Sequence, residues 1–164
     1  MSVHKIEGVD GVDHFPKKYV TLYASGLLAA GDFVMIDPLD TTNGLGASVR
    51  KSQSGYNANI HEGLCIGVAT ETVAAGKYCV IQTAGKYENA SVATTVVSGQ
   101  NLVMSASPGM AQDATQLDSS SNADALERNI IAVALESEAS ASGTEPASGT
   151  TNKADVLIVD QGYF

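Results

Sequence analysis

The sequence predicts an all-β fold, a small β-barrel or β-sandwich of the tulip or jelly-roll kind with about eight strands. Apolar residues occur in short segments that alternate with small or polar residues and are separated by glycine turns, which is the period of strands. Segments of this kind recur along the chain. Charged residues make up only 16% of the sequence and Trp is absent, whereas a helical bundle would be richer in Leu, Glu and Lys.

The clearest hairpin pattern lies in residues 63–87. Leu64, Ile66 and Val68 alternate with smaller residues, which predicts that all three point to one face of a strand. A polar segment with a glycine follows and indicates a turn, because glycine tolerates positive φ. Tyr78–Gln82 is predicted to form the returning strand.

This pattern is repeated elsewhere, at irregular spacing. Ala29–Asp37 matches Ala74–Gln82 almost position for position. Weaker copies are found at Ser98–Met104, at Ile130–Glu136, which resembles Cys65–Glu71, and at Ala154–Val159. The irregular spacing argues against a solenoid or propeller and predicts one β domain built from similar hairpins.

The chain is expected to consist of an extended N-terminal arm (1–18) and a single β domain (19–164). Polar inserts are expected near 38–62, 107–128 and 136–153, with a loop over Gln112–Ser121 and a short helical turn over Asn122–Arg128. Besides the hairpin above, strands are predicted at Tyr19–Tyr23, Phe33–Ile36, Asn89–Val97 (exposed), Leu102–Ala106, Asn129–Leu135 and 154–159.

Both chain ends are candidates for contacts with other molecules. The arm is polar, contains Gly8, Gly11 and Pro16, and carries three of the nine basic residues. It is either a frayed terminus or an arm that lies on a partner's surface. The chain ends on Tyr163 and Phe164, an aromatic pair expected to be covered, within this subunit or by a neighbouring one.

Composition and cysteine usage restrict the function further. The net charge of −9 argues against binding nucleic acid, because phosphate contacts need a basic surface. Cys65 and Cys79 both lie in predicted strands and are expected to be buried, reduced thiols, with a disulfide across the hairpin as the alternative. The first residues lack the apolar segment of a secretory leader, and no apolar run approaches a membrane span, so synthesis and folding in a cytoplasm are expected.

No catalytic, metal-binding or cofactor-binding set stands out. His4, His14 and His61 are scattered, and no spacing typical of a zinc site or a serine nucleophile is present. The glycine-rich segment Asn43–Ser48 lacks the lysine of a phosphate-binding loop. An enzyme is therefore the least favoured class.

The Gly-Val-Ala strand, acidic residue, Ala-Ala-Gly turn and second apolar strand resemble the small decoration, or cement, proteins of tailed-bacteriophage capsids. The resemblance covers roughly Leu27–Tyr87 and is found again at Asn129–Val159. It implies a structural protein of the virion that is made in the host bacterial cytoplasm, binds the major capsid protein on the outer surface of the shell at subunit junctions, and stabilises the shell. It also suggests a homo-oligomer, with a trimer favoured.

The resemblance leaves the contact residues to be inferred from the sequence. For the capsid we expect the arm residues Val3, His4, Lys5, Ile6, Phe15, Lys17 and Lys18, and for contacts between copies Tyr163 and Phe164. The alternative function is a β-fold binding module of a phage fibre or baseplate accessory that recognises carbohydrate or another protein. The low aromatic content of 5% argues against the carbohydrate version.

Overall fold

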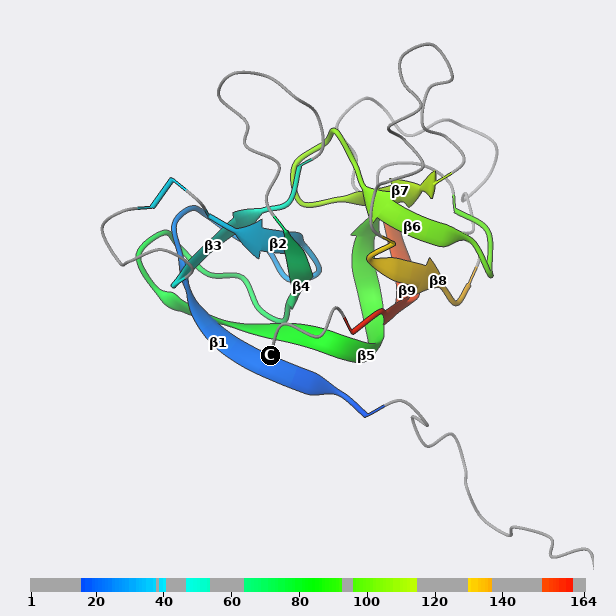
Figure 1. The fold of residues 1–164 in the computed structure, drawn as a ribbon, viewed down its shortest axis with the longest axis horizontal. Coiled ribbons are helices and arrows are strands. Elements are labelled where there is room, and N and C mark those ends of the chain that lie inside the picture. Colours follow the sequence, from blue (N-terminus) through cyan, green and yellow to red (C-terminus); the bar gives the residue numbers. More distant parts are fainter. Residues whose placement is uncertain are drawn as a thin grey trace, which may run out of the picture.

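The computed structural model describes residues 16–37, 39–40, 47–53, 64–92, 96–114, 130–136 and 152–160. These residues form an all-β fold, as predicted, with nine strands in one mixed sheet of order β1-β3-β2-β4-β5-β7-β6-β8-β9 (Figure 1). The strands are β1 (Lys18–Ala24), β2 (Phe33–Ile36), β3 (Ser48–Lys51), β4 (Cys65–Ala69), β5 (Tyr78–Val92), β6 (Asn101–Met104), β7 (Ala111–Asp113), β8 (Ala132–Ala134) and β9 (Asn152–Ile158).

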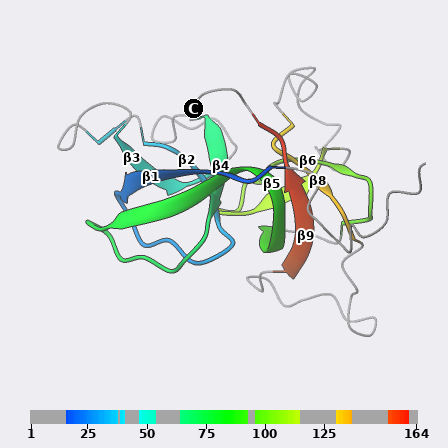
Figure 2. The same cartoon turned by 90° about the horizontal axis from the view of Figure 1, so that it is seen from below.

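The pairing closes on itself twice, and β5 belongs to both closed rings. Residues 78–84 of β5 pair with β1, which continues through β3, β2 and β4 back to β5. Residues 85–92 pair with β9, which continues through β8, β6 and β7 back to β5. We call these rings the first unit and the second unit; Figure 2 shows β5 passing from one to the other.

The two units repeat the same pairing scheme strand by strand. In the first unit, Val49 of β3 pairs with Ala24 of β1 and Ile36 of β2. In the second unit the same three positions are Ala111 of β7, Val92 of β5 and Met104 of β6. Likewise, Phe33 pairs with Val68 across β2 and β4, and Asn101 pairs with Val133 across β6 and β8. The chain is therefore an internal structural duplication in which β5 is both the last strand of one unit and the first of the next.

Within the first unit, the two copies of the Ala-Ala-Gly segment are related by a local twofold relationship. The backbone N–H of Leu28 donates to the carbonyl of Val73, and the N–H of Val73 donates to the carbonyl of Leu28. Three residues later, Gly31 donates to Ala69 and Gly76 donates to Ala24. Each repeat is thus a strand–turn–strand segment whose first strand pairs with the other copy's second strand. The prediction of hairpins is wrong for the first copy, because β1 and β2 pair with other strands and not with each other.

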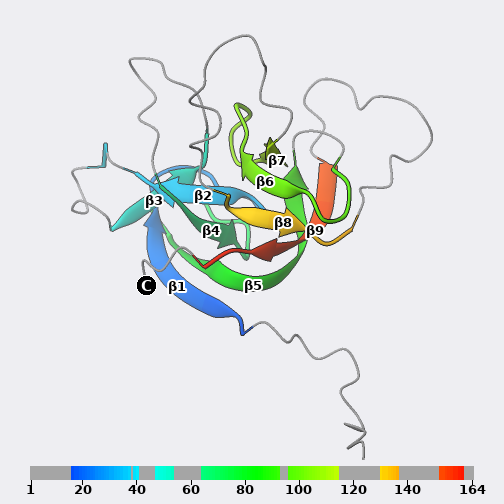
Figure 3. The ribbon, with the colours of Figure 1, turned by 45° about the vertical axis from the view of Figure 1, so that its right-hand side comes forward.

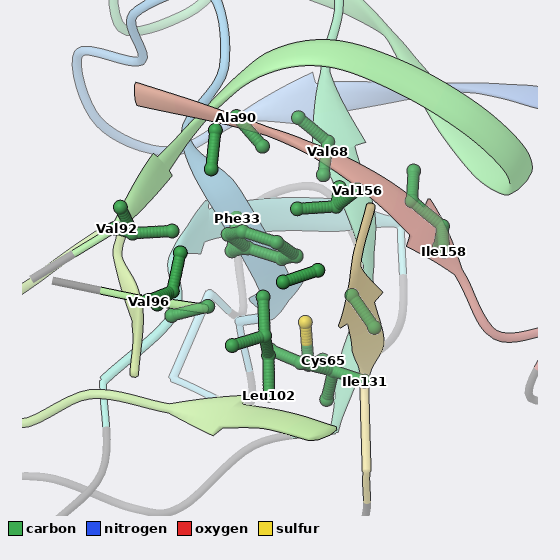
Figure 4. Packing of buried hydrophobic residues seen from close by; sticks show 14 residues of the cluster. Phe33, Cys65, Val68, Ala90, Val92, Val96, Leu102, Ile131, Val156 and Ile158 are labelled. Carbon is green, nitrogen blue, oxygen red and sulfur yellow. The ribbon is translucent and has the colours of Figure 1, made fainter. Parts of the chain in front are cut away.

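Each unit contains a hydrophobic core, and strands β2 and β4 separate the two cores. Val34 packs into the core of the first unit, whereas its neighbour Phe33 packs into the core of the second (Figure 4). All five residues of β4 are buried. Strands buried on both faces have continuous apolar sequences, which explains why these two segments are so apolar.

The prediction that Leu64, Ile66 and Val68 share one face is wrong for Val68. Ile66 lies in the first core, with Leu64 packed against it, and Val68 lies in the second core. The reason is a bulge: Val34 pairs with Gly67 but Met35 pairs with Cys65, so Ile66 is an extra residue in β4.

The segment after Gly85 is also not a separate strand. β5 continues for 15 residues to Val92, although Gly85 and Asn89 both have positive φ. The expected exposed strand Asn89–Val97 is therefore wrong, because Ala90–Val92 belongs to β5 and is buried in the second unit. Irregular residues here bend one strand without ending it.

Two strands lie inside segments predicted to be polar loops. β3 falls in the expected insert 38–62, and β7 falls in the expected insert 107–128 and overlaps the start of the expected loop Gln112–Ser121. Both are short and largely polar, and they form because an apolar residue, Val49 or Ala111, fits into a core. The predicted helical turn at 122–128 lies outside the described residues. In the described part of the chain, no helix is long and apolar enough to cross a membrane.

Short strands often leave unpaired edges, and in this fold most of the strand edges are paired. Each of the nine strands has hydrogen-bonded neighbours on two sides. The pairing is partial on β1, however: β3 pairs only with Tyr23 and Ala24, so among the described strands residues 18–22 of β1 have a strand neighbour on the β5 side alone (Figure 3).

Candidate functional site

A cluster of polar residues joins the two units at the turn that leads into β2. Asp32 is buried, and its carboxylate lies 2.9 Å from the ammonium group of Lys51 and accepts a hydrogen bond from the N–H of Ala29. Ser91 of the second unit is also buried and donates to Asp32 over 3.5 Å. Lys153 of β9 donates to Ser91 and to the carbonyl of Ala30. We call Asp32, Lys51, Ser91 and Lys153 the junction cluster.

Two glycines allow the units to approach each other this closely. A Cβ atom on Gly31, whose φ is +90°, would lie 2.6 Å from the carbonyl oxygen of Asn89 and 2.7 Å from the ammonium nitrogen of Lys153. A Cβ on Gly109, in the β6–β7 turn, would lie 3.0 Å from the carboxyl carbon of Asp32. The backbone of Gly109 also bonds to Phe33 and Ser52 across the junction.

The electrostatics of the cluster follow from its partial burial. Lys153 is an exposed residue, but loss of solvent around its ammonium group lowers its pKa. The nearby carboxylate of Asp32 opposes this effect and Lys51 reinforces it. Burial raises the pKa of Tyr87, whose hydroxyl donates to the carbonyl of Ala69 across the same junction. Every polar group named here has a partner within the protein, so the arrangement is that of a structural connection.

The second unit carries the counterpart of the Asp32–Lys51 pair. Gln100 occupies the place of Asp32: it accepts a hydrogen bond from the N–H of Val97 and donates to Asp113, which occupies the place of Lys51. The ion pair of the first unit is thus replaced in the second unit by a hydrogen bond between an amide and a carboxylate. The sequence interpretation did not identify this site, and the available signal was the polar residue directly after the glycine in each repeat.

The structure describes few of the predicted partner-binding residues. Lys18 is the first residue of β1, and its ammonium group forms an exposed ion pair of 2.5 Å with Asp160. The backbone of Lys17 packs on β5, where a Cβ on Gly85 would lie 3.1 Å from its Cα. These two lysines therefore belong to the folded domain. Outside the described residues lie Val3, His4, Lys5, Ile6, Phe15, Tyr163 and Phe164, together with His14 and His61.

Both cysteines are free and buried, as predicted. Burial raises the pKa of Cys65 to about 12. The pKa of Cys79 is also raised, by burial first and then by the charge of Glu71. Cys65 belongs to the second core and Cys79 to the first, so the two thiols lie in different cores. Among the described residues, no group of three or more His, Cys, Asp or Glu side chains could hold a metal ion.

Two surface features remain. Tyr19, Tyr23 and Tyr78 lie on the outer side of β1 and β5, with Tyr78 71% exposed and packed edge-on against Tyr23. A shallow groove of about 300 Å³ lies where the first unit meets the β6–β7 turn and is lined by Gly26, Leu27, Arg50, Lys51, Gln53 and Pro108. Lys51 in this groove is already paired with Asp32, so the exposed tyrosines are the more available of the two surfaces for contact with a partner.

Comparison with known proteins identifies the fold. No family model matches the chain, and no curated protein matches it. Among solved structures, it is similar to the N base of the head fiber gp8.5 of bacteriophage phi29, with 13% sequence identity and a TM-score of 0.51. The match covers 88% of this chain and 96% of that chain, so the shared fold includes both units.

Proposed function

We propose that this protein is a structural virion protein of a bacteriophage that binds the outside of the capsid at subunit junctions and stabilises the shell. The observation that supports the proposal is the likeness of both units to the base of a phage head fiber. The sequence resemblance to capsid decoration proteins, which rests on the Ala-Ala-Gly hairpins, points to the same place in a virion. The proposed role is mechanical and not catalytic.

The proposed partners are the major capsid protein and other copies of this chain, with a trimer favoured. A protein present in many copies on a shell gains affinity from several simultaneous contacts, even where each contact is weak. The net charge of −9 is consistent with a partner other than nucleic acid, and no membrane contact is proposed.

For the capsid contact we propose the segment that precedes Pro16. It includes Val3, His4, Lys5, Ile6 and Phe15, and it could follow the surface of a capsid subunit by adding backbone hydrogen bonds to a strand. Lys18 has a smaller part in this proposal than the sequence suggested, because its charge is already paired with Asp160.

A truncation tests the proposal. Deleting residues 2–15 removes only residues ahead of β1, so the melting temperature should stay nearly unchanged. Sedimentation with capsids stripped of this protein should then show strongly reduced binding, while a Lys18→Ala variant should bind like the intact chain. If the truncated protein occupies capsids at the intact level, the arm is not the contact. If the intact chain fails to bind, the capsid function itself is wrong.

The second candidate is a binding module of a phage fibre, because the similar structure belongs to a fiber. The exposed tyrosines Tyr19 and Tyr78 offer faces on which a sugar ring could stack. Glycan-array binding that is lost in a Tyr78→Ala variant, together with no capsid binding by the intact chain, would favour this candidate.

A further inference from the structure

The two units of one chain meet in two places. Phe33 and Val68 of the first unit pack into the second core, and beside this core contact two different surfaces meet. The first unit contributes the turn Ala29–Asp32 at the start of β2. The second unit contributes the outer side of β5 and β9, where Ser91 pairs with Lys153. The carbonyl of Gly31 accepts a hydrogen bond from the backbone N–H of Ser91, and the carbonyl of Ala30 accepts one from the side-chain ammonium group of Lys153. The contact is therefore heterologous, the type that can continue from one unit to the next.

Because the units are duplicates, the first unit also has a sheet surface equivalent to that of Ser91 and Lys153, and the second unit also has a turn equivalent to Ala29–Asp32. Among the described residues, nothing covers either of these two surfaces. The counterpart of Ser91 and Lys153 in the first unit is the pair Tyr23 and Tyr78, of which Tyr78 is exposed and Tyr23 is partly buried. The counterpart of Ala29–Asp32 in the second unit is the turn Val97–Gln100, where Val97 is 51% exposed. We call the surface formed by Tyr19, Thr21, Tyr23 and Tyr78 the tyrosine face, and the surface formed by Val97, Ser98, Gly99, Asn101 and Val133 the turn face.

The glycines in the two turns show the difference directly. Gly31 and Gly99 have nearly the same φ, +90° and +87°. Above Gly31, a Cβ would collide with Asn89 and Lys153 of the second unit, whereas above Gly99 there is nothing within 4 Å. The second unit fills the space above Gly31, whereas the equivalent space above Gly99 is empty.

Compared with the internal contact, both open faces carry uncharged residues at the positions where the internal contact has opposite charges. In the internal contact, burial lowers the pKa of Lys153, and the charge of the nearby Asp32 carboxylate opposes this lowering. On the open faces, Gln100 stands in place of Asp32 and Tyr78 in place of Lys153, so both sides are uncharged. Val97 replaces the smaller Ala29 and adds an apolar contact for an aromatic partner.

We propose that the tyrosine face of one copy binds the turn face of a second copy, which repeats between molecules the turn-to-sheet part of the contact that joins the units within one molecule. The two faces lie on different units: β1 and the first half of β5 in one, β6 and β8 in the other (Figure 1). A heterologous contact closes into a ring when its rotation allows, which accommodates a trimer. This inference names the contact for the homo-oligomer proposed above and does not depend on capsid binding.

Self-association of the purified full-length chain tests the proposal without any capsid. Light scattering and sedimentation over a range of concentrations should detect oligomers. Tyr78→Asp or Val97→Asp should weaken association at least about tenfold, as expected for a residue at the centre of a contact. Leu27→Asp changes a residue that is 64% exposed but lies on neither face, and it should associate like the intact chain. A monomer at all concentrations, or equal association of all four proteins, overturns the proposal.

Cross-linking between two variants distinguishes this contact from a symmetric one. Thr21→Cys lies on the tyrosine face and Ser98→Cys on the turn face, and the native thiols are buried. Neither variant should form disulfide-linked dimers alone, and the mixture should form them readily. Dimers in either single-variant sample, or none in the mixture, contradict the proposal. Mixing Tyr78→Lys with Val97→Asp should likewise restore association that each loses alone.

Discussion

Phe33 faces Val68 across β2 and β4, and both side chains leave the first unit and enter the core of the second. The repeat places Tyr78 and Tyr23 at the same positions on β5 and β1, where their rings form an edge-on pair at the surface with centroids 5.4 Å apart. The same strand–turn–strand repeat thus gives a buried contact on one side of the first unit and a surface pair of tyrosines on the other.

Phe33 should therefore be critical for stability. Five of the fourteen buried residues of the second core are alanines, and Phe33 is the largest fully buried side chain among them (Figure 4). Phe33→Ala should lower the free energy of unfolding by about 3–5 kcal/mol in denaturant titrations, because it leaves a cavity. Tyr78→Ala, its exposed counterpart, should cost less than about 0.5 kcal/mol for the isolated chain.

Gly67 lies where the backbone of β4 passes close to β5. A Cβ there would lie 2.1 Å from the carbonyl oxygen of Gln82, a backbone atom that cannot move without shifting the sheet. Gly67→Ala should therefore be among the most destabilising single changes, costing more than about 3 kcal/mol or preventing folding. Gly26→Ala is the matched control: no atom lies within 4 Å of its Cβ position, and its melting temperature should equal that of the intact protein or exceed it.

The Asp32–Lys51 pair can be exchanged for the pair found in the second unit. Asp32→Gln alone should cost about 1–3 kcal/mol, because it removes the carboxylate that serves Lys51 and Ser91. The double variant Asp32→Gln with Lys51→Asp rebuilds the Gln100–Asp113 arrangement and should lose less than the sum of the two single variants. Additive losses in a double-mutant cycle would mean that the two positions do not interact.

Lys18→Ala, which breaks only a surface ion pair, should cost about 0–1 kcal/mol.

Alkaline pH should destabilise the protein partly through Cys65. Its pKa is about 12 in the folded state, above the ordinary value of 9.0 that we assign to the unfolded chain. The contribution is therefore complete below pH 9.0 and is lost as the pH rises toward 12, because only the unfolded chain then releases the proton. Between about pH 8 and pH 10.5, the intact protein should lose about 1–2 kcal/mol more than Cys65→Ala. Equal losses in the two proteins would show that the thiol does not contribute.

Much of the local structure follows from the sequence. The Ala-Ala-Gly segments predicted turns followed by strands, and the matching bonds of Gly31 and Gly76 confirm that the two copies are equivalent. The all-β class and the burial of both cysteines were predicted for the same reason, since local patterns of apolar residues and glycines act over a few residues.

Other features could not be predicted because they depend on contacts between distant segments. β3 and β7 have no apolar alternation, and they become strands because neighbouring strands offer them backbone partners. The junction cluster joins residues far apart in the chain, and nothing near Asp32 in the sequence indicates Lys153.

By itself, the sequence determined that this chain folds as a β protein from repeated strand–turn–strand segments, because apolar periodicity and turn residues act locally. Only the tertiary structure decided which strands pair and that the segments form two duplicated units. It also decided that a bulge at Ile66 and Gly67 sends Val68 to a different core from Ile66, and that one face of each unit is buried while another stays open. The physical reason is that a side chain's face depends on strand register and on the unit that packs against it. A single extra residue in β4 reverses that face without changing the local pattern.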